Sequence, residues 1–252
     1  MANELKGKVA IVTGATRNQG RAYAEMLAAN GCANVVVHHR GENSRSEAEE
    51  TANAVRAKGA EPLVFQADLT KVSEVRRMFD ESDKRFGRLD ILINNAGVVI
   101  KKPFTEITEE EYDRAFGINA KAAFFCMQEA ARRISDGGRV INIGTSLLGA
   151  TTGSYSVYAG SKAPLEDFTR ALAKEIGQRG VTVNTVCPGP LNTSFFYPAE
   201  TPDSIEFFKH MSVQNRLGEI GDVVPLIEFL VSPKGGWVTA QTIFVNGGFL
   251  AR

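Results

Sequence analysis

The sequence predicts an α/β fold, a single-domain, doubly wound, mostly parallel sheet of seven strands with helices on both faces. Two observations predict it. Short runs rich in β-branched residues alternate with longer amphipathic segments along the whole chain. No linker, repeat or low-complexity block interrupts this alternation, so nothing marks a domain boundary. Strand–helix alternation at this spacing favours parallel strands, because each connection must place a helix on one face of the sheet.

The expected strands are short and continuously apolar, which is typical of parallel strands buried on both faces. They are residues 9–13, 34–38, 62–66, 89–94, 139–143, 181–186 and 242–245. The expected helices have apolar residues at helical spacing. They are residues 20–30, 44–58, 72–86, 109–134, 158–178 and 221–231. Ser44 and Thr108 are expected N-caps, and Gly31, Gly59 and Gly180 are expected to end the helices that precede them.

Composition narrows the class of protein. Hydrophobic residues make up 43% of the chain and charged residues 23%, as in a soluble globular protein with a substantial core. The 29 Lys and Arg residues balance 29 Asp and Glu residues, which argues against general binding to nucleic acid or to an anionic membrane. Three cysteines in apolar surroundings predict neither disulfides nor a metal site, and fit a reducing compartment. Without an apolar signal core or a membrane-length run, the expected location is cytoplasmic.

The turn after the first expected strand is the first candidate binding site. Residues 13–20 read Thr-Gly-Ala-Thr-Arg-Asn-Gln-Gly and open the first helix. Backbone N–H groups and the helix dipole at such a turn can receive a pyrophosphate. Gly14 allows a tight turn, and Gly20 allows close approach of helix and strand. The turn therefore predicts a nucleotide beyond the carboxyl ends of the strands, with a purely structural turn as the alternative.

Tyr158 and Lys162 are the candidate catalytic pair. They are four residues apart at the start of an expected helix, so they share a face. A phenol titrates near ~10 in water, and a nearby ammonium lowers that pKa by favouring the phenolate. Lowering it to about 7 needs roughly 4 kcal/mol, which one ammonium in a partly desolvated pocket could supply, with a cofactor's charge as a further contributor. The alternative is an exposed tyrosine with a surface lysine one turn further on.

Several motifs, in order and spacing, make the chain resemble the short-chain dehydrogenase/reductase family over essentially its whole length. Beside the turn and the Tyr–Lys pair they are Asp68-Leu69, Asn94-Asn95-Ala96-Gly97, Asn119, Pro188-Gly189 and Asn246-Gly247-Gly248. The resemblance implies one Rossmann-type catalytic domain over residues 1–252. It also implies hydride transfer between a nicotinamide and a ketone, aldehyde or secondary alcohol.

The resemblance assigns roles in this reaction. Tyr158 would be the general acid and base, Lys162 would lower its pKa and bind the nicotinamide ribose, and Asn119 would hold a proton-relaying water. A Ser or Thr after the fifth strand would bind the substrate oxygen. Spacing from Tyr158 selects Thr145, whereas the sequence Ser-Leu-Leu-Gly at 146–149 resembles the family's Ser-x-x-Gly. Neighbouring strand residues face opposite sides. Ser146 is slightly preferred on residue type, with Thr145 almost level.

The expected cofactor is NADP(H) rather than NAD(H). Residues 37–41 read Val-His-His-Arg-Gly and lack the carboxylate that would bind an adenosine 2′-hydroxyl. Arg17 and Arg40 suit a 2′-phosphate, and a solvated loop charge is the alternative for Arg40. Asn18 replaces the family's middle glycine, and Asn tolerates a positive φ, so binding should be kept. By resemblance the cofactor contacts are Gly14, Thr16, Arg17, Asn18, Gln19, Gly20, His39, Arg40, Asp68, Leu69, Asn95, Ala96, Gly97, Tyr158, Lys162, Pro188, Gly189, Leu191 and Thr193.

Substrate and assembly are less closely determined by the sequence. Residues 191–214 are rich in aromatic side chains, which could form a mobile lid on a hydrophobic substrate or a helix packed on the body or on a partner. The resemblance implies a homotetramer that uses the 109–134 segment and the C-terminal region. A 3-oxoacyl-thioester reductase is the second enzyme hypothesis. A nucleotide-sensing regulator is the non-catalytic one, and the intact Tyr158 and Lys162 argue against it.

Overall fold

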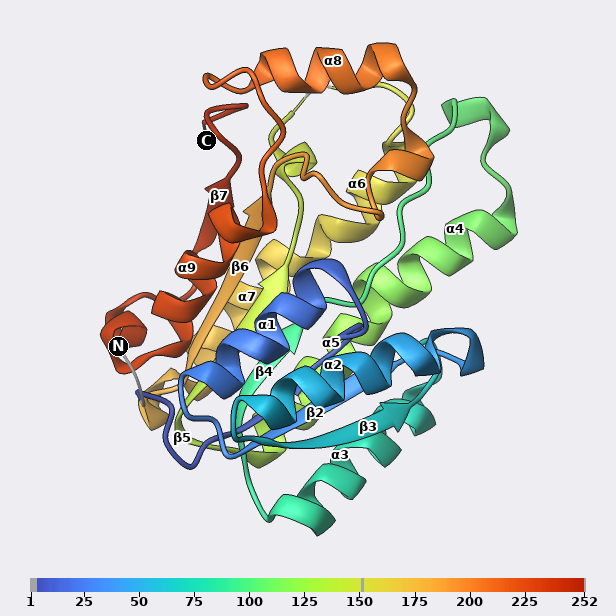
Figure 1. The fold of residues 1–252 in the computed structure, drawn as a ribbon. Coiled ribbons are helices and arrows are strands. Elements are labelled where there is room, and N and C mark those ends of the chain that lie inside the picture. The colour runs from blue at the N-terminus through green and yellow to red at the C-terminus, as the bar shows by residue number, and fades with distance from the viewer. Residues whose placement is uncertain (1–3, 151, 252) are drawn as a thin grey trace.

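A seven-stranded sheet lies between two layers of helices in the computed structural model (Figure 1). The structure describes residues 4–150 and 152–251, so residues 1–3, 151 and 252 of the expected domain lie outside the described part. The strand order is β3-β2-β1-β4-β5-β6-β7, and each neighbouring pair is parallel. The order reverses between β1 and β4, which is where a doubly wound sheet opens a crevice for ligands. The strands are β1 (Val9–Val12), β2 (Asn34–His39), β3 (Glu61–Gln66), β4 (Leu89–Asn94), β5 (Ile134–Ile143), β6 (Thr182–Pro188) and β7 (Thr242–Val245).

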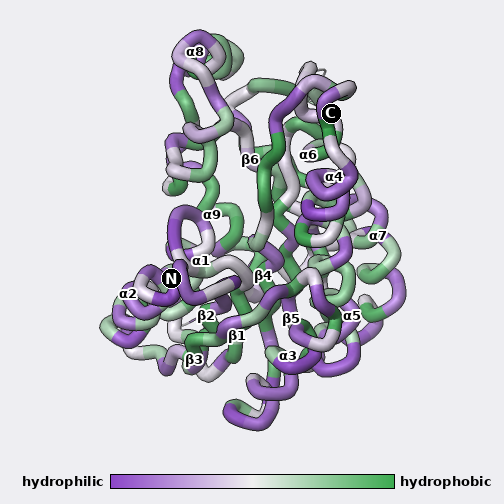
Figure 2. Tube along the Cα trace, turned by 90° about the vertical axis from the view of Figure 1, so that its right-hand side faces the viewer, coloured by the Kyte–Doolittle hydropathy of each residue, from purple (hydrophilic) through white to green (hydrophobic). Residues whose placement is uncertain are grey.

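Three helices cover each face of the sheet (Figure 2). One layer holds α1 (Asn18–Ala29), α2 (Arg45–Ala57) and α9 (Ile220–Val231). The other holds α3 (Val72–Phe86), α5 (Ala123–Arg133) and α7 (Pro164–Ile176). Because strand side chains alternate between faces, Ala10 and Val12 join the core under the first layer, while Ile11 joins the core under the second. This burial on both faces explains the continuous apolar runs of the strands.

Two expected helices are divided in the structure. The expected helix 109–134 consists of α4 (Glu109–Phe116), a π-helical turn (Gly117–Ala122) and α5. The expected helix 158–178 consists of α6 (Ser156–Lys162) and α7, followed by a short 3₁₀ turn (Gly177–Arg179). Pro164 begins α7 because it has no backbone N–H to continue the hydrogen bonds of α6. Both divisions lie next to the cavity described below.

The helix ends follow the expected signals with one exception. Thr108 caps α4 in a capping box with Glu111. Gly31, Gly59 and Gly180 follow their helices with positive φ, at 95°, 90° and 69°. Ser44, by contrast, precedes α2 without a capping bond, because its hydroxyl donates to the Gly41 carbonyl at 2.8 Å.

The segment between β6 and α9 contains a helix, α8 (Pro202–Met211), which lies beyond the carboxyl ends of the strands (Figure 1). Residues 191–214 thus contain a helix, and Phe208 of this helix lines the cavity described below, so the choice between a mobile lid and a packed helix stays a prediction. Thr201 caps it in a capping box with Ser204, and Pro202 stands at its first position, where a missing N–H costs nothing.

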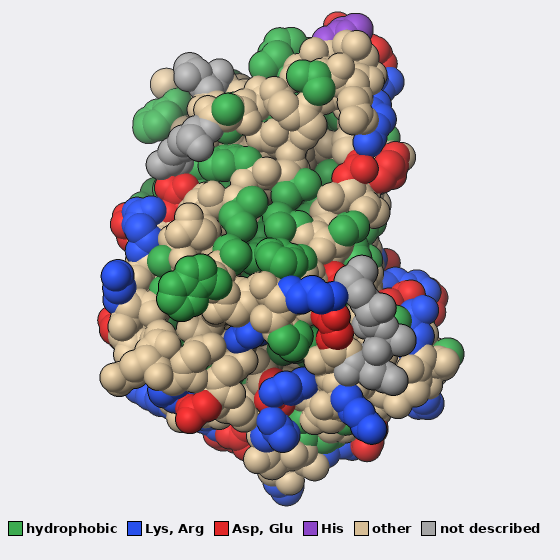
Figure 3. All heavy atoms as spheres, turned by 90° about the vertical axis from the view of Figure 1, so that its left-hand side faces the viewer, with side chains coloured by type: hydrophobic (Ala, Val, Ile, Leu, Met, Phe, Trp, Pro, Cys, Tyr) green, Lys and Arg blue, Asp and Glu red, His purple; other side chains and the backbone are tan. Residues whose placement is uncertain are grey.

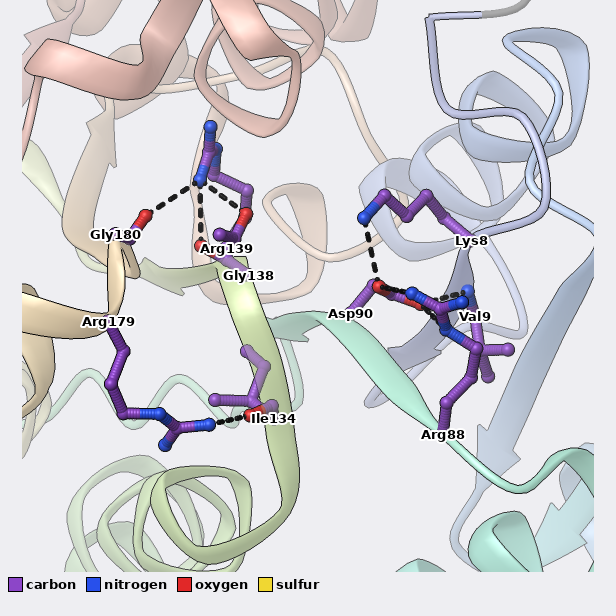
Figure 4. A network of polar contacts seen from close by, with 10 residues as sticks. Lys8, Val9, Arg88, Asp90, Ile134, Gly138, Arg139, Arg179 and Gly180 are labelled. Carbon is purple, nitrogen blue, oxygen red and sulfur yellow. Dashed lines mark hydrogen bonds and ion pairs between the residues drawn. The ribbon is translucent and has the colours of Figure 1, made fainter.

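Polar contacts stabilise the amino-terminal ends of the strands (Figure 4). The Asp90 carboxylate, 1% exposed, accepts from Lys8 Nζ at 3.0 Å, from the Val9 N–H at 3.0 Å and from Arg88 Nη2 at 2.6 Å. These contacts join β1 to β4. Buried Arg139 of β5 donates to the carbonyls of neighbouring loops, including Gly180 at 3.3 Å. The carboxyl ends of the strands, on the opposite side of the sheet, border the ligand cavity.

None of the described helices combines the length and the apolar character that crossing a bilayer requires.

Candidate active site

A cavity of about 400 Å³ opens beyond the carboxyl ends of β1, β2, β4, β5 and β6. It contains almost all of the expected site residues. Those that line it are Gly14, Thr16, Arg17, Asn18, Gln19, Gly20, His39, Arg40, Leu69, Asn95, Ala96, Gly97, Thr145, Ser146, Tyr158, Lys162, Pro188, Gly189, Leu191 and Thr193. Two expected residues do not line it, Asp68 and Asn119. Asp68 instead accepts hydrogen bonds from the N–H and the hydroxyl of Thr70, at 3.2 and 2.8 Å.

The turn after β1 has the close packing that its glycines predict. Gly14 has a φ of +63°, and a Cβ on Gly20 would lie 2.0 Å from the Gly14 carbonyl oxygen. Asn18 has a φ of +48°, so the expectation that Asn fits the place of the family glycine is confirmed for the backbone. Its side-chain amide makes a hydrogen bond outside the turn. Asn18 Nδ2 donates to the hydroxyl of Ser194 at 3.0 Å, which joins this turn to the segment after β6.

His38 is a functional residue that the sequence analysis missed. The Gly14 N–H donates to His38 Nδ1 at 2.9 Å, and His38 Nε2 lies 3.0 Å from the Ala67 carbonyl. Because Nδ1 accepts, Nε2 must carry the proton that it donates to Ala67. Burial lowers the pKa of His38 to about 4, which keeps this ring neutral. A polar residue inside a β-branched run was the only available signal.

The motif after β4 fastens the same turn from the other side. Asn95 Nδ2 donates to the carbonyls of Thr13 and Gly14 at 3.1 and 2.9 Å. The Thr13 hydroxyl in return accepts from the N–H groups of Asn95 and Ala96 at 2.9 and 3.0 Å. The β1 and β4 ends are therefore locked together at the sheet's switch point, and the turn presents a fixed backbone to the cavity.

Tyr158 and Lys162 both face the cavity from α6, as their spacing predicts. Their exposed fractions are 9% and 4%, which excludes the alternative of an exposed surface pair. Lys162 Nζ donates to the Ile143 carbonyl at 2.7 Å. The cavity thus holds a phenol and an ammonium on one helix face.

The expected direction of the tyrosine pKa shift is wrong for this structure. Burial raises the pKa of Tyr158 to about 12, and a hydrogen bond with Thr145 only partly opposes that rise. Burial also lowers the pKa of Lys162 to about 8. Desolvation penalises both charged forms, and Lys162 is engaged with the backbone rather than with the phenol.

The two candidate hydroxyls after β5 point in different directions. The Thr145 hydroxyl accepts from the Leu147 N–H at 3.3 Å and lies near enough to Tyr158 to lower the pKa of that phenol. The Ser146 hydroxyl is 2% exposed at the residue level and donates to the Cys187 carbonyl at 3.1 Å. Both residues line the cavity, so the choice between Ser146 and Thr145 stays a prediction, and the position of Thr145 beside the phenol supports Thr145 in the proposal below.

Asn119 lies in the π-helical turn, behind the lining rather than in it. It is 1% exposed, so it does not face solvent from the helix surface. Its Nδ2 donates to Val98 O and Ser161 Oγ, both at 2.9 Å, and its Oδ1 accepts from the Val98 N–H at 2.9 Å. An added Cβ on Gly97 would lie 3.0 Å from Asn119 Oδ1 and 3.3 Å from Lys162 Nζ. The Gly97 backbone therefore lies close to both the Asn119 and the Lys162 side chains.

The two ends of the cavity differ in chemistry. Near β2, Arg17 and Arg40 are exposed and line the cavity, and Arg17 also pairs with Glu47 at 3.5 Å. At the other end the wall is apolar and aromatic, with Val99, Leu147, Phe196, Phe208 and Phe249. Among the described lining residues the only carboxylate is that of Glu200, in this second half. A charged ligand end suits the first half and an apolar group the second.

Known proteins with the same fold and sequence pattern were found by three comparisons. A family model described as Enoyl-(Acyl carrier protein) reductase matches residues 14–250. A short-chain type dehydrogenase/reductase of Picea abies is 41% identical over 97% of this chain and 93% of its own length. An NADPH-dependent aldehyde reductase-like protein, chloroplastic, of Arabidopsis thaliana is 37% identical over 98% of this chain and 95% of its own.

Solved structures agree closely with this one. A Burkholderia cenocepacia protein solved with bound NADP has a TM-score of 0.96 and 47% identity, covering 100% of this chain and 97% of its own. A blue fluorescent protein from a metagenomic library, in complex with NADPH, has a TM-score of 0.93 and 36% identity. It covers 98% of this chain and 100% of its own.

Proposed function

The chain belongs to the short-chain dehydrogenase/reductase family, and on that premise we propose that it is an NADP(H)-dependent reductase of ketones or aldehydes. One observation carries the proposal. Tyr158, Lys162 and Thr145 line the same cavity as the glycine turn after β1. A proton donor, a second hydroxyl donor and a fixed cation thus surround one space beside a dinucleotide-type turn.

The residues of the cavity fit the cofactor. The turn from Gly14 to Gly20 offers backbone N–H groups at the start of α1, and a Cβ at Gly20 would collide with Gly14 at 2.0 Å. Arg17 and Arg40 would bind a 2′-phosphate, and NADP bound to the Burkholderia relative supports this choice. When bound, the nicotinamide supplies the hydride. Lys162 is proposed to bind the ribose hydroxyls beside it.

Tyr158 is proposed as the proton donor to the developing alkoxide. The pKa of this phenol, raised to about 12 by burial, makes it a weak acid that is protonated at neutral pH and donates to a stronger base, such as the developing alkoxide. Thr145, which lies beside the phenol, would donate to the same substrate oxygen. Lys162, with a pKa lowered to about 8 by burial, would remain mostly cationic at neutral pH and stabilise negative charge nearby. Asn119 is proposed to hold a water on the path by which Tyr158 regains its proton.

We also propose that the enzyme acts as a homotetramer in a reducing compartment, the cytoplasm. Cys32, Cys126 and Cys187 are buried and lie outside any disulfide of the described residues, which supports a reducing compartment. A reductase of 3-oxoacyl thioesters is the second candidate, because the matching family model carries an acyl-carrier-protein description.

A panel of ketones, diketones, sugars and acyl thioesters, followed by NADPH absorbance, tests the function and separates the two candidates. Tyr158→Phe should lower turnover by about 10²- to 10⁴-fold, because it removes the proton donor, while NADPH affinity measured by calorimetry is kept. Tyr112→Phe is the matched control, since Tyr112 is a half-exposed phenol on α4. Retained turnover in Tyr158→Phe, or no NADPH oxidation with the whole panel, contradicts the proposal.

A further inference from the structure

An ion pair between Glu200 and Lys101 lies at the apolar half of the cavity, with Glu200 in the lining and Lys101 behind it. Glu200, between β6 and α8, lines the cavity although its side chain is 1% exposed. Its carboxylate accepts from Lys101 Nζ at 2.5 Å, from the Ser204 hydroxyl at 2.6 Å and from the Tyr155 hydroxyl. The donors come from three places: the loop after β4, the start of α8 and the residue before α6.

Lys101 is enclosed on its other sides by aromatic rings. Its side chain is 22% exposed, and its Nζ lies 5.2 Å from the Tyr155 ring centroid and 6.0 Å from that of Phe208. The ammonium is thus bounded by one carboxylate and two ring faces. Glu200 thus cancels the charge of Lys101, which does not itself line the cavity, at this part of the wall. Removing one partner of such a pair leaves the other charge uncompensated in a poorly hydrated place.

The apolar residues around the pair decide what a neutral wall would accept. Phe208, Phe249 and Leu147 belong to the same aromatic cluster as Tyr155 and Tyr158. A compartment of this kind favours uncharged, apolar groups, because a carboxylate would lose its hydration there without gaining the ammonium of Lys101, which is already paired with Glu200. Glu200 also engages the hydroxyl of Tyr155, which leaves that of Tyr158 as the phenol available to a substrate.

We infer that Glu200 determines the substrate's charge class: by binding Lys101 it presents a neutral wall that selects uncharged apolar carbonyl compounds over those bearing a carboxylate. The inference rests on the proposed reductase function. It makes Glu200 and Lys101 specificity residues rather than catalytic ones.

The pair can be tested one charge at a time. Glu200→Gln keeps the size and one acceptor oxygen but frees the charge of Lys101, so the wall becomes cationic. Lys101→Met keeps the apolar stem and leaves Glu200 as an unpaired anion. The double variant restores a neutral wall. Glu206→Gln is the matched control, because Glu206 lies on α8 with an exposed side chain paired to Lys209.

The probes are a matched pair, para-methylacetophenone and para-acetylbenzoate. For each variant, kcat/KM with NADPH is measured together with the Kd of both compounds for the NADP⁺-saturated protein by calorimetry. We expect the wild type to prefer the neutral ketone, and Glu200→Gln to shift the Kd ratio toward the carboxylate by at least about tenfold, from exposing one cation at short range. Lys101→Met should shift it the other way, and the double variant and Glu206→Gln should match the wild type.

An unchanged Kd ratio in Glu200→Gln, or an equal change for both compounds, overturns the inference. If Glu200→Gln does not fold, as judged by circular dichroism, the opposite shift in Lys101→Met decides in its place, and no shift there overturns the inference. A shifted Kd ratio without turnover of either ketone keeps the inference and rejects the reductase proposal for this compound class.

Discussion

Thr145 and Ser146 are neighbours in the chain, and their different orientations decide which hydroxyl can reach the substrate. Thr145→Ala should lower kcat/KM by roughly 10²-fold or more, because it removes a donor to the developing oxyanion. Ser146→Ala should leave kcat/KM within a few-fold and instead lower stability by about 1 kcal/mol, since its buried bond to the Cys187 carbonyl is lost. Steady-state kinetics and thermal denaturation of both variants check this. The reverse ranking would return the role to Ser146.

Arg17 and Arg40 carry the cofactor preference. Replacing both by Ala should raise KM for NADPH by about tenfold or more and leave KM for NADH nearly unchanged, because only NADPH has the 2′-phosphate that guanidinium groups would bind. Kinetics with each cofactor measure the difference. Arg170→Ala serves as the control, since Arg170 is exposed on α7 and pairs with Asp167. Equal effects on the two cofactors would remove the argument for a 2′-phosphate site.

Residues of this site were predictable from sequence when their role follows from local spacing. Tyr158 and Lys162 share a helix face, and Asn18 has the positive φ that its place in the turn requires. His38 and Glu200 were not, because their partners are distant in the chain: His38 binds Gly14, and Glu200 binds Lys101. The direction of the Tyr158 pKa was mistaken for a similar reason, since burial depends on the surrounding tertiary structure.

At the scale of elements, the strands follow the β-branched runs closely because parallel burial leaves little freedom in composition. β5 nevertheless begins at Ile134, five residues before the expected start at 139. The residues between contain Gly137 and Gly138, which do not indicate a strand. The π-helical turn was not predictable, because it depends on the contact of Asn119 with Val98, far along the chain. α8 carried a usable signal, the Thr201 cap followed by Pro202.

Asp90 joins β1 and β4, so its substitution tests how much this contact between strands stabilises the fold. Asp90→Asn should lower the free energy of unfolding by about 1–3 kcal/mol, because the Val9 N–H, Lys8 and Arg88 lose the buried carboxylate that accepts from them. Chemical denaturation measures it. Asp136→Asn, at an exposed pair with Arg179, should cost less than about 1 kcal/mol. A loss no larger than that of Asp136→Asn would contradict the assignment.

The Asp90 contribution should also depend on pH. Burial alone would raise the pKa of Asp90, but hydrogen bonds from Arg88, the Val9 N–H and Lys8 outweigh it and hold the pKa below its ordinary value. A lowered folded-state pKa means that the stabilisation is complete above the unfolded pKa of about 4 and is lost as the pH falls through the folded value. The stability difference between wild type and Asp90→Asn should therefore shrink below about pH 4.

At the scale of the whole molecule, two surfaces remain more apolar than an isolated chain needs. On α5 and α7, Phe124 is 40% exposed and its ring packs edge-on against Phe168 at 5.0 Å. On the side where α9 and β7 lie, hydrophobic side chains gather in the middle of the face (Figure 3). Trp237 is 97% exposed and Phe229 40% exposed. Aromatic side chains left this exposed are typical of interface anchors.

If these two surfaces are the two interfaces of a homotetramer, a substitution on either one should disrupt the tetramer. Light scattering at micromolar concentration should give a tetramer for the wild type and smaller species for Phe124→Glu and for Trp237→Glu, since each buries a charge in an apolar contact. Lys84→Glu places a carboxylate at an exposed position of α3, changes the charge by two units instead of one, and should stay tetrameric. A monomeric wild type would refute the assembly. A tetrameric Trp237→Glu would place the second interface elsewhere, and the exposed tryptophan would then need another partner.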